Sequence, residues 1–153
     1  MFRHKGSELE FLLVHPGGPF WLNKNEGAWS IPKGEYNEGE EALAVAQREF
    51  FEETGSKITG PFYQLAPVRQ KGGKLIQAWA AQGDLNAAEV RSNQFEIEWP
   101  PRSGRMQQFP EIDRAGWFAM PEAKKMVNPA QIELLEELAT ALRAKNLSRN
   151  KRH

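Results

Sequence analysis

Cysteine is absent from this chain of 153 residues. Its absence excludes disulfide bonds, thiolate nucleophiles and zinc sites built on cysteine. Long apolar runs are also missing, because no stretch of about 18 apolar residues predicts a transmembrane helix. The start at Met1-Phe2-Arg3 lacks the apolar core of a signal peptide. We therefore expect a soluble cytoplasmic protein without a membrane partner.

The sequence also lacks an excess of charge of either sign. Lys and Arg together number 20, as do Asp and Glu, so the formal net charge is zero. A balanced charge gives no general attraction to nucleic acid or to an anionic membrane surface. We therefore expect no binding to duplex DNA. A locally acidic site is compatible with this balance and must be sought in the arrangement of the carboxylates.

The length and the apolar content set the domain organisation. Apolar residues make up 40% of the chain and include five Trp and nine Phe. This is enough for one hydrophobic core at this chain length. We expect a single domain over residues 1–145. Residues 146–153 are polar and basic, and they are predicted to form a disordered tail.

Hydrophobic patterning and turn residues predict the strands. Residues 62–70 and 75–82 are expected to pair through the Gly72-Gly73 turn. Other segments combine strand-forming residues with flanking Pro or Gly. These further predicted strands are Leu9–Val14, Ala28–Ile31, Phe95–Trp99 and Ala115–Met120.

Two helices are predicted. Residues 40–54 are rich in helix formers, and Gly55 follows where a C-cap requires conformational freedom. Asn128 as N-cap and Pro129 as first residue open the second helix. Its apolar stripe consists of Ile132, Leu135, Leu138, Ala139 and Leu142. Strands interleaved with these helices predict an α/β fold, a mixed sheet sandwiched between helices.

Three glutamates of the first helix carry the chemical signal. Glu49, Glu52 and Glu53 lie three and four positions apart, so a helix places them on one face. Like-charged neighbours cost roughly a few tenths of a kcal/mol per pair on an exposed helix. Mg²⁺ removes this cost, because it takes oxygen ligands and leaves positions for water and phosphate. The alternative is a solvated helix face, where most charged residues lie.

The spacing of seven residues in this region is specific. They follow the order G-x5-E-x7-R-E-x-x-E-E-x-G, and chance would produce them in one window with a probability on the order of 10⁻⁹ to 10⁻⁸. The residues are Gly34, Glu40, Arg48, Glu49, Glu52, Glu53 and Gly55. The pattern resembles the Nudix box, G-x5-E-x7-R-E-U-x-E-E-x-G-U, in which U is bulky and aliphatic. Phe50 and Ser56 depart from this pattern at two U positions.

The resemblance implies the Nudix fold and a Mg²⁺-dependent hydrolysis of a diphosphate linkage in a nucleotide-like substrate, with Mn²⁺ as a possible substitute. It implies that Glu49, Glu52 and Glu53 are catalytic metal ligands and that the carbonyl of Gly34 adds a further ligand. Arg48 is expected to orient these carboxylates together with Glu40, a role that activity still requires. Family domains also commonly have a further strand before the region of Arg3.

Outside the box, Glu111 is the main candidate. Glu111-Ile112-Asp113-Arg114-Ala115-Gly116-Trp117 resembles the segment where many family members place a further acidic ligand or general base. The alternative is an exposed loop glutamate after Pro110.

The substrate is indicated by the lead-in to the box. Trp29-Ser30-Ile31-Pro32-Lys33-Gly34 resembles the W-x-x-P-K-G segment of dinucleoside-polyphosphate hydrolases, so these substrates are favoured. Lys33 would contact a phosphate as a point charge, or would simply be solvated. Alternative activities are RNA 5′-pyrophosphohydrolase, ADP-ribose pyrophosphatase and NTP pyrophosphatase. A non-catalytic nucleotide-binding module is the competing class, although such relatives usually lose box carboxylates that this chain keeps.

Overall fold

The secondary structure comes from a computed structural model, which describes residues 1–33, 40–69, 72–73 and 75–150, without the side chains of 146–150. The first half contains β1 (Phe2–Lys5), β2 (Glu8–Pro16), α1 (Ala42–Thr54), β3 (Tyr63–Gln64), β4 (Val68–Arg69), β5 (Leu75–Ile76) and β6 (Trp79–Ala80). The second half contains the 3-10 turn Ala87–Glu89, β7 (Gln94–Glu98), β8 (Met106–Pro110), β9 (Ile112–Ala119), α2 (Met120–Met126), the 3-10 turn Pro129–Gln131 and α3 (Ile132–Asn150).

The centre of the fold is the antiparallel sheet β1-β2-β9. Residues 11–15 of its middle strand, β2, are all buried. A strand covered on both faces needs apolar residues at successive positions, which explains why residues 11–14 do not alternate with polar ones. Parallel contacts occur as isolated bridges, such as the one between Phe2 and Gln82.

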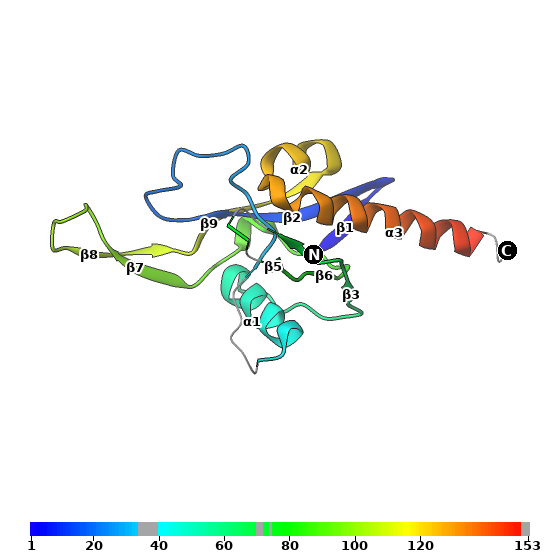
Figure 1. The fold of residues 1–153 in the computed structure, drawn as a ribbon, viewed down its shortest axis with the longest axis horizontal. Helices are drawn as coiled ribbons and strands as arrows, with labels where there is room; N and C mark the ends of the chain where they lie inside the picture. The colour runs from blue at the N-terminus through cyan, green and yellow to red at the C-terminus, as the bar shows by residue number, and fades with distance from the viewer. Residues whose placement is uncertain (34–39, 70–71, 74, 151–153) are drawn as a thin grey trace.

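Helices lie on both sides of the strands (Figure 1). In this view α1 lies below the sheet and α2 lies above it, whereas α3 overlaps β1 and β2 and runs out toward the C-terminus. The predicted α/β fold, a mixed sheet sandwiched between helices, is confirmed by this arrangement and by solved structures of the same fold. None of the described helices is long and apolar enough to cross a membrane.

Two hairpins lie outside this three-stranded sheet. The predicted strands over 62–70 and 75–82 form one irregular hairpin with two short ladders, β3–β6 and β4–β5. Gly72 and Gly73 have φ angles of 97° and 85° at its tip, in a region that glycine enters without strain. The second hairpin, β7–β8, projects from the body of the molecule (Figure 1). Sequence patterning did not predict β8, because Gln107 and Gln108 interrupt any apolar alternation.

The predicted capping residues lie at or near the helix ends. Gly55 has a φ angle of 77°, and its N–H donates to the carbonyl of Phe51 at the end of α1. The side chain of Asn128 accepts a hydrogen bond from the N–H of Ala130, but it caps the 3-10 turn Pro129–Gln131, and α3 begins at Ile132 and not at the predicted Pro129. Helix α3 continues to Asn150, beyond the expected start of a disordered tail at residue 146, because no Gly or Pro interrupts it. Residues 151–153 lie outside the described residues.

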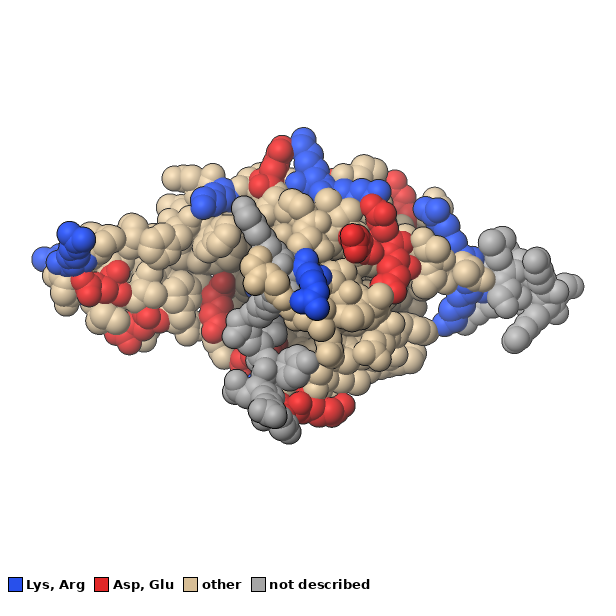
Figure 2. Space-filling view, in the orientation of Figure 1, with Lys and Arg blue, Asp and Glu red and all other residues tan. Residues whose placement is uncertain are grey.

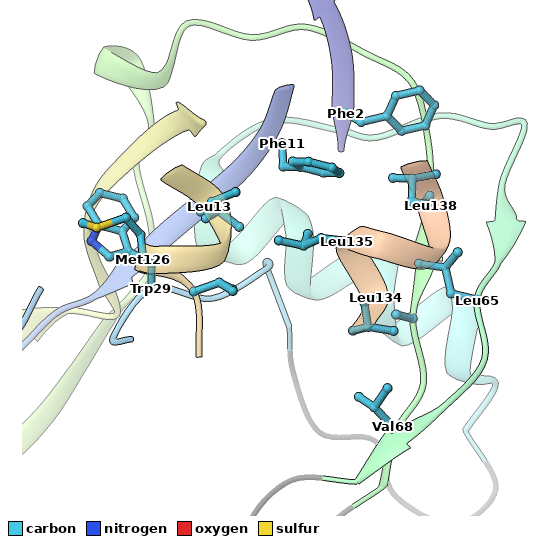
Figure 3. Packing of buried hydrophobic residues seen from close by; sticks show 14 residues of the cluster. Phe2, Phe11, Leu13, Trp29, Leu65, Val68, Met126, Leu134, Leu135 and Leu138 are labelled. Atoms are coloured by element: carbon cyan, nitrogen blue, oxygen red, sulfur yellow. The ribbon is translucent and has the colours of Figure 1, made fainter. Parts of the chain in front are cut away.

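The core lies between β2, α3 and the first hairpin (Figure 3). Leu134, Leu135 and Leu138 of α3 point into it and meet Leu13 and Leu65. The predicted apolar stripe of α3 is therefore confirmed, with Leu134 added. On the surface shown in Figure 2, acidic and basic side chains are interspersed, in keeping with the zero net charge.

We expect Leu135→Ala to lower the free energy of unfolding by roughly 2–5 kcal/mol, because it deletes methyl groups from a packed interior and leaves a cavity. Leu135 is 3% exposed. Urea denaturation measures the effect, with Leu22→Ala as the matched control because Leu22 is 66% exposed. Equal unfolding midpoints for the two variants would contradict the packing of α3.

Candidate active site

Helix α1 carries three of the predicted site residues. Val45 and Phe50 are buried and anchor the helix. Glu53 lies at the edge of this buried side and is itself 7% exposed. The side chains of Glu49 and Glu52 are 18% and 32% exposed. The helix therefore holds three carboxylates in a gradient from buried to partly solvated.

Glu53 is tied to the segment that precedes the helix. Its Oε2 atom accepts a hydrogen bond from the backbone N–H of Lys33 at 3.1 Å. Burial raises the pKa of Glu53 to about 7, and the charges of Glu49 and Glu111 act in the same direction. Lys33 opposes this rise through its charge and its N–H. At neutral pH a metal-free Glu53 is therefore partly protonated.

Glu49 shares its surroundings with other carboxylates. Burial raises its pKa, and the neighbouring charge of Glu52 raises it further. Arg48 opposes the shift, whereas Glu111 and a hydrogen bond with Glu52 add to it. These groups repel one another as anions, so a proton or a cation stabilises the cluster.

The structure brings Glu111 to the helix carboxylates. It follows β8 directly, and its pKa is raised by burial and then by the charge of Glu52. Its N–H donates to the carbonyl of Asn93 at 2.8 Å, and the N–H of Asn93 donates to the carbonyl of Glu52 at 2.7 Å. The backbone of Asn93 thus connects the end of α1 to Glu111. The role of Glu111 as a metal ligand or general base stays a prediction.

Arg48 lies among the carboxylates that it was predicted to orient. Its Nη1 donates to Oε2 of Glu40 at 3.2 Å. Its guanidinium also lies 3.9 Å from a carboxylate oxygen of Glu49 and 3.9 Å from one of Glu52. Since the Arg48 side chain is 51% exposed, these longer contacts stabilise the fold little. The orienting role of Arg48 stays a prediction.

Gln131, directly before α3, holds the Trp29–Lys33 segment through hydrogen bonds. Gln131 is fully buried, and its Oε1 accepts a hydrogen bond from the N–H of Ile31 at 2.9 Å. Its Nε2 donates to the hydroxyl of Ser30 at 3.0 Å. Lys33 follows with an exposed side chain. Gly34, the predicted carbonyl ligand, lies outside the described residues.

The donor set suits a hard cation in its chemistry. The side-chain donors are carboxylate oxygens, which Mg²⁺ prefers, and their mutual repulsion is the unfavourable interaction that a cation removes. Within the described residues, no group of three carboxylates or histidines surrounds one point closely enough to enclose an ion. Mg²⁺ binds through one or two carboxylates with water and phosphate completing its shell. Glu49, Glu52 and Glu53 are the residues that would hold it.

A cavity of about 520 Å³ lies beside the inner face of α1. Phe11, Phe50 and Leu135 line it together with other apolar residues, and Lys33 lies at its border. The described residues that line it include no carboxylate. The carboxylates of the glutamate cluster therefore do not line this cavity.

The sequence reasoning assigned no role to His15. The structure shows it fully buried, with Nδ1 at 2.7 Å from Oδ1 of Asp113 and Nε2 at 2.6 Å from the carbonyl of Lys24. A histidine at the end of an apolar strand could have signalled a buried, hydrogen-bonded side chain, because a buried polar group needs partners. Those partners come from distant parts of the sequence and could not be named from it.

Comparisons with known proteins support one family. A model of the NUDIX domain matches residues 1–138. An RNA pyrophosphohydrolase of Brucella anthropi is 30% identical over 132 residues, covering 75% of this chain and 70% of the relative. An RNA pyrophosphohydrolase of Mesorhizobium japonicum is 25% identical over 128 residues, covering 74% and 69%.

Solved structures agree on the fold. The NUDIX domain of Shewanella oneidensis NrtR, complexed with ADP ribose, has a TM-score of 0.61 at 18% identity and covers 92% of this chain and 82% of that one. A binary complex of a C. elegans Ap4A hydrolase has a TM-score of 0.60 at 21% identity, covering 94% and 93%. At these identities the likeness concerns the fold alone.

The pKa of Glu53 predicts a pH dependence of stability. In the metal-free protein this pKa is about 7, above the ordinary value of 4.5. The folded state binds the proton more tightly than the unfolded state, so stability falls as the pH rises from 4.5 to 7. At about 1.36 kcal/mol per pKa unit, the loss is roughly 3 kcal/mol.

Urea unfolding of the wild type and Glu53→Gln in EDTA, at about pH 5 and about pH 8, tests this dependence. The variant lacks the titrating group, and its amide oxygen still accepts from the N–H of Lys33. We expect the wild type to lose stability relative to the variant at the higher pH. A constant difference between the two proteins would contradict the buried carboxyl.

Proposed function

This chain belongs to the NUDIX family, and we propose that it hydrolyses a diphosphate linkage in a nucleotide-like substrate with Mg²⁺ as its cofactor. Its NUDIX domain and its similarity to RNA pyrophosphohydrolases identify the chain as a pyrophosphohydrolase. The observation that carries the proposal is the electrostatic coupling of Glu111 to Glu49, Glu52 and Glu53. Such a cluster of anions suits a reaction in which a cation and phosphates meet a water.

Each residue of the site has a chemical task in this proposal. Glu49, Glu52 and Glu53 hold the ion, and Arg48 limits their directions. When bound, Mg²⁺ would neutralise the diphosphate and activate the attacking water. Glu111 accepts the proton of that water, since a carboxyl with a raised pKa is suited to general-base catalysis near neutral pH. The backbone N–H of Lys33 bonds to Glu53 and its charge acts on that carboxyl, so its exposed side chain contacts a phosphate.

Dinucleoside polyphosphates are the substrate class that we put first. The supporting observation is the Trp29–Lys33 lead-in, held by Gln131 so that Lys33 is adjacent to the carboxylate of Glu53. A cation at this place meets phosphates beyond the one that is attacked. Such a site favours a chain of several phosphates over a single diphosphate.

RNA with a 5′-triphosphate is the second candidate. The supporting observation is that both curated relatives are RNA pyrophosphohydrolases, at 30% and 25% identity. A 5′-triphosphate also presents a chain of phosphates to the carboxylates, so the two candidates differ in the length of this chain and in the groups at its ends. Specificity of this kind depends on residues outside the shared box.

A hydrolysis screen with Mg²⁺ separates these substrates. It includes diadenosine tetraphosphate, 5′-triphosphorylated RNA, ADP-ribose and nucleoside triphosphates, with EDTA as the control. We expect cleavage of diadenosine tetraphosphate, abolished by EDTA. Preferential cleavage of the RNA would replace the first candidate by the second. If the folded protein cleaves none of these compounds, the nucleotide-binding module becomes the better explanation.

We expect Glu52→Gln to lower kcat/KM by about 10²-fold or more, since loss of a metal ligand removes several kcal/mol of transition-state stabilisation. Glu41→Gln is the matched control, because Glu41 precedes the same helix and makes no side-chain cap hydrogen bond. Rates are measured over a range of Mg²⁺ concentrations. A Glu52→Gln rate within about threefold of the wild type would remove the metal ligand role.

Glu111→Gln tests the fourth carboxylate separately. We expect kcat to fall by about 10²- to 10⁴-fold, the range over which a general base contributes. The amide cannot accept a proton from water at neutral pH, although it keeps the size of the carboxylate. Unchanged kcat and unchanged Mg²⁺ dependence would return Glu111 to the alternative of an exposed loop residue.

A further inference from the structure

His15 is a buried polar residue with both ring nitrogens engaged. It is 0% exposed and lies near the end of β2, where the strand leaves the core. Its Nε2 donates to the carbonyl of Lys24, because a carbonyl oxygen only accepts. Its Nδ1 lies 2.7 Å from Oδ1 of Asp113. These two atoms form a hydrogen bond.

Asp113 occupies a β-bulge. On the ladder between β2 and β9, His15 pairs with Arg114 and Pro16 pairs with Ile112. Asp113 is therefore an extra residue opposite the step from His15 to Pro16. Such bulges bend a strand and redirect the neighbouring side chains. Here the side chain of the extra residue turns to the ring of His15.

The bulge lies two residues from Glu111, and its surroundings leave Glu111 little freedom. The N–H of Gly17 donates to the carbonyl of Glu111 at 2.8 Å, and the N–H of Glu111 donates to the carbonyl of Asn93 at 2.8 Å. A Cβ atom on Gly17 would collide with the carbonyl oxygen of Pro110. The end of β2 is therefore packed directly against the backbone that carries Glu111.

We propose that the bond between His15 and Asp113, here termed the bulge clasp, fixes Glu111 against the carboxylates of α1. His15 and Asp113 are positioning residues, because they act on the reaction through Glu111. The clasp joins Asp113 to β2, where the ladder between β2 and β9 gives Asp113 no paired residue. This inference rests on the proposed function for its effect on rate, but its effect on the backbone is independent of that function.

Two substitutions of His15 separate its two hydrogen bonds. Asn carries its amide nitrogen at about the place of Nδ1 and keeps a donor toward Asp113. Gln carries its amide nitrogen at about the place of Nε2 and keeps a donor toward Lys24. We expect His15→Gln to lower kcat by about 10- to 100-fold, with KM within about threefold of the wild type. We expect His15→Asn to stay within about threefold of the wild-type kcat.

A double-mutant cycle with Glu111→Gln tests whether the effect passes through Glu111. If the clasp acts by positioning this carboxylate, His15→Gln lowers the rate of Glu111→Gln by less than about threefold. A general loss of structure would instead lower both rates by the same factor. His4→Gln is the matched control, because His4 is an exposed histidine on the neighbouring strand β1. Equal factors in the two backgrounds would overturn the proposal.

Amide hydrogen exchange tests the clasp without turnover. In the full-length chain, we expect His15→Gln to speed exchange at the N–H of Gly17, which donates to the carbonyl of Glu111, and at the N–H of Glu111, which donates to the carbonyl of Asn93. In His15→Gln, we expect exchange at the N–H of Leu13 to stay unchanged. In His4→Gln, we expect exchange at Gly17 and Glu111 to stay unchanged. Unchanged protection at Gly17 and Glu111 would overturn the proposal. If the wild type cleaves no substrate, the proposed function fails, and the exchange rates alone decide on the clasp.

Discussion

Repulsion between carboxylates is the constraint on which the rest of this structure depends. Glu53 and Glu111 come from segments far apart in the sequence; burial raises the pKa of Glu53 most, and the charges of Glu49 and Glu111 raise it further. Anions approach in this way only when a rigid scaffold holds them. Here Val45 and Phe50 anchor the helix, and the backbone of Asn93 bonds to both Glu52 and Glu111. The scaffold maintains an unfavourable interaction that a bound cation would relieve.

The elements that the sequence predicted have local causes. Gly55 ends α1 and Asn128 begins the 3-10 turn before α3 through groups close to them in the chain, so single residues were sufficient signals. The neighbourhood of the helix glutamates follows from helical spacing alone. Glu111 was found through its resemblance to a family segment, and the structure places it within electrostatic reach of Glu49.

The features that the sequence did not predict depend on contacts between residues far apart in the sequence. His15 and Asp113 are separated by 98 positions, and Gln131 lies 100 positions from Ile31. No periodicity links such pairs. Strand β8 escaped because its position is set by pairing with β7 and not by its own polar sequence. The shape of the site could thus be anticipated, whereas the residues that hold this shape could not.

The projection of the β7–β8 hairpin has an evolutionary consequence. Its base joins Asn93 to Glu111 through a backbone hydrogen bond, whereas its turn around Arg102 lies at the far end of the arm (Figure 1). Residues gained or lost at that turn leave the hydrogen bonds of the base in place, and longer surface loops cost little. Descendants of this chain can therefore diversify the arm while inheriting the same arrangement of acidic groups.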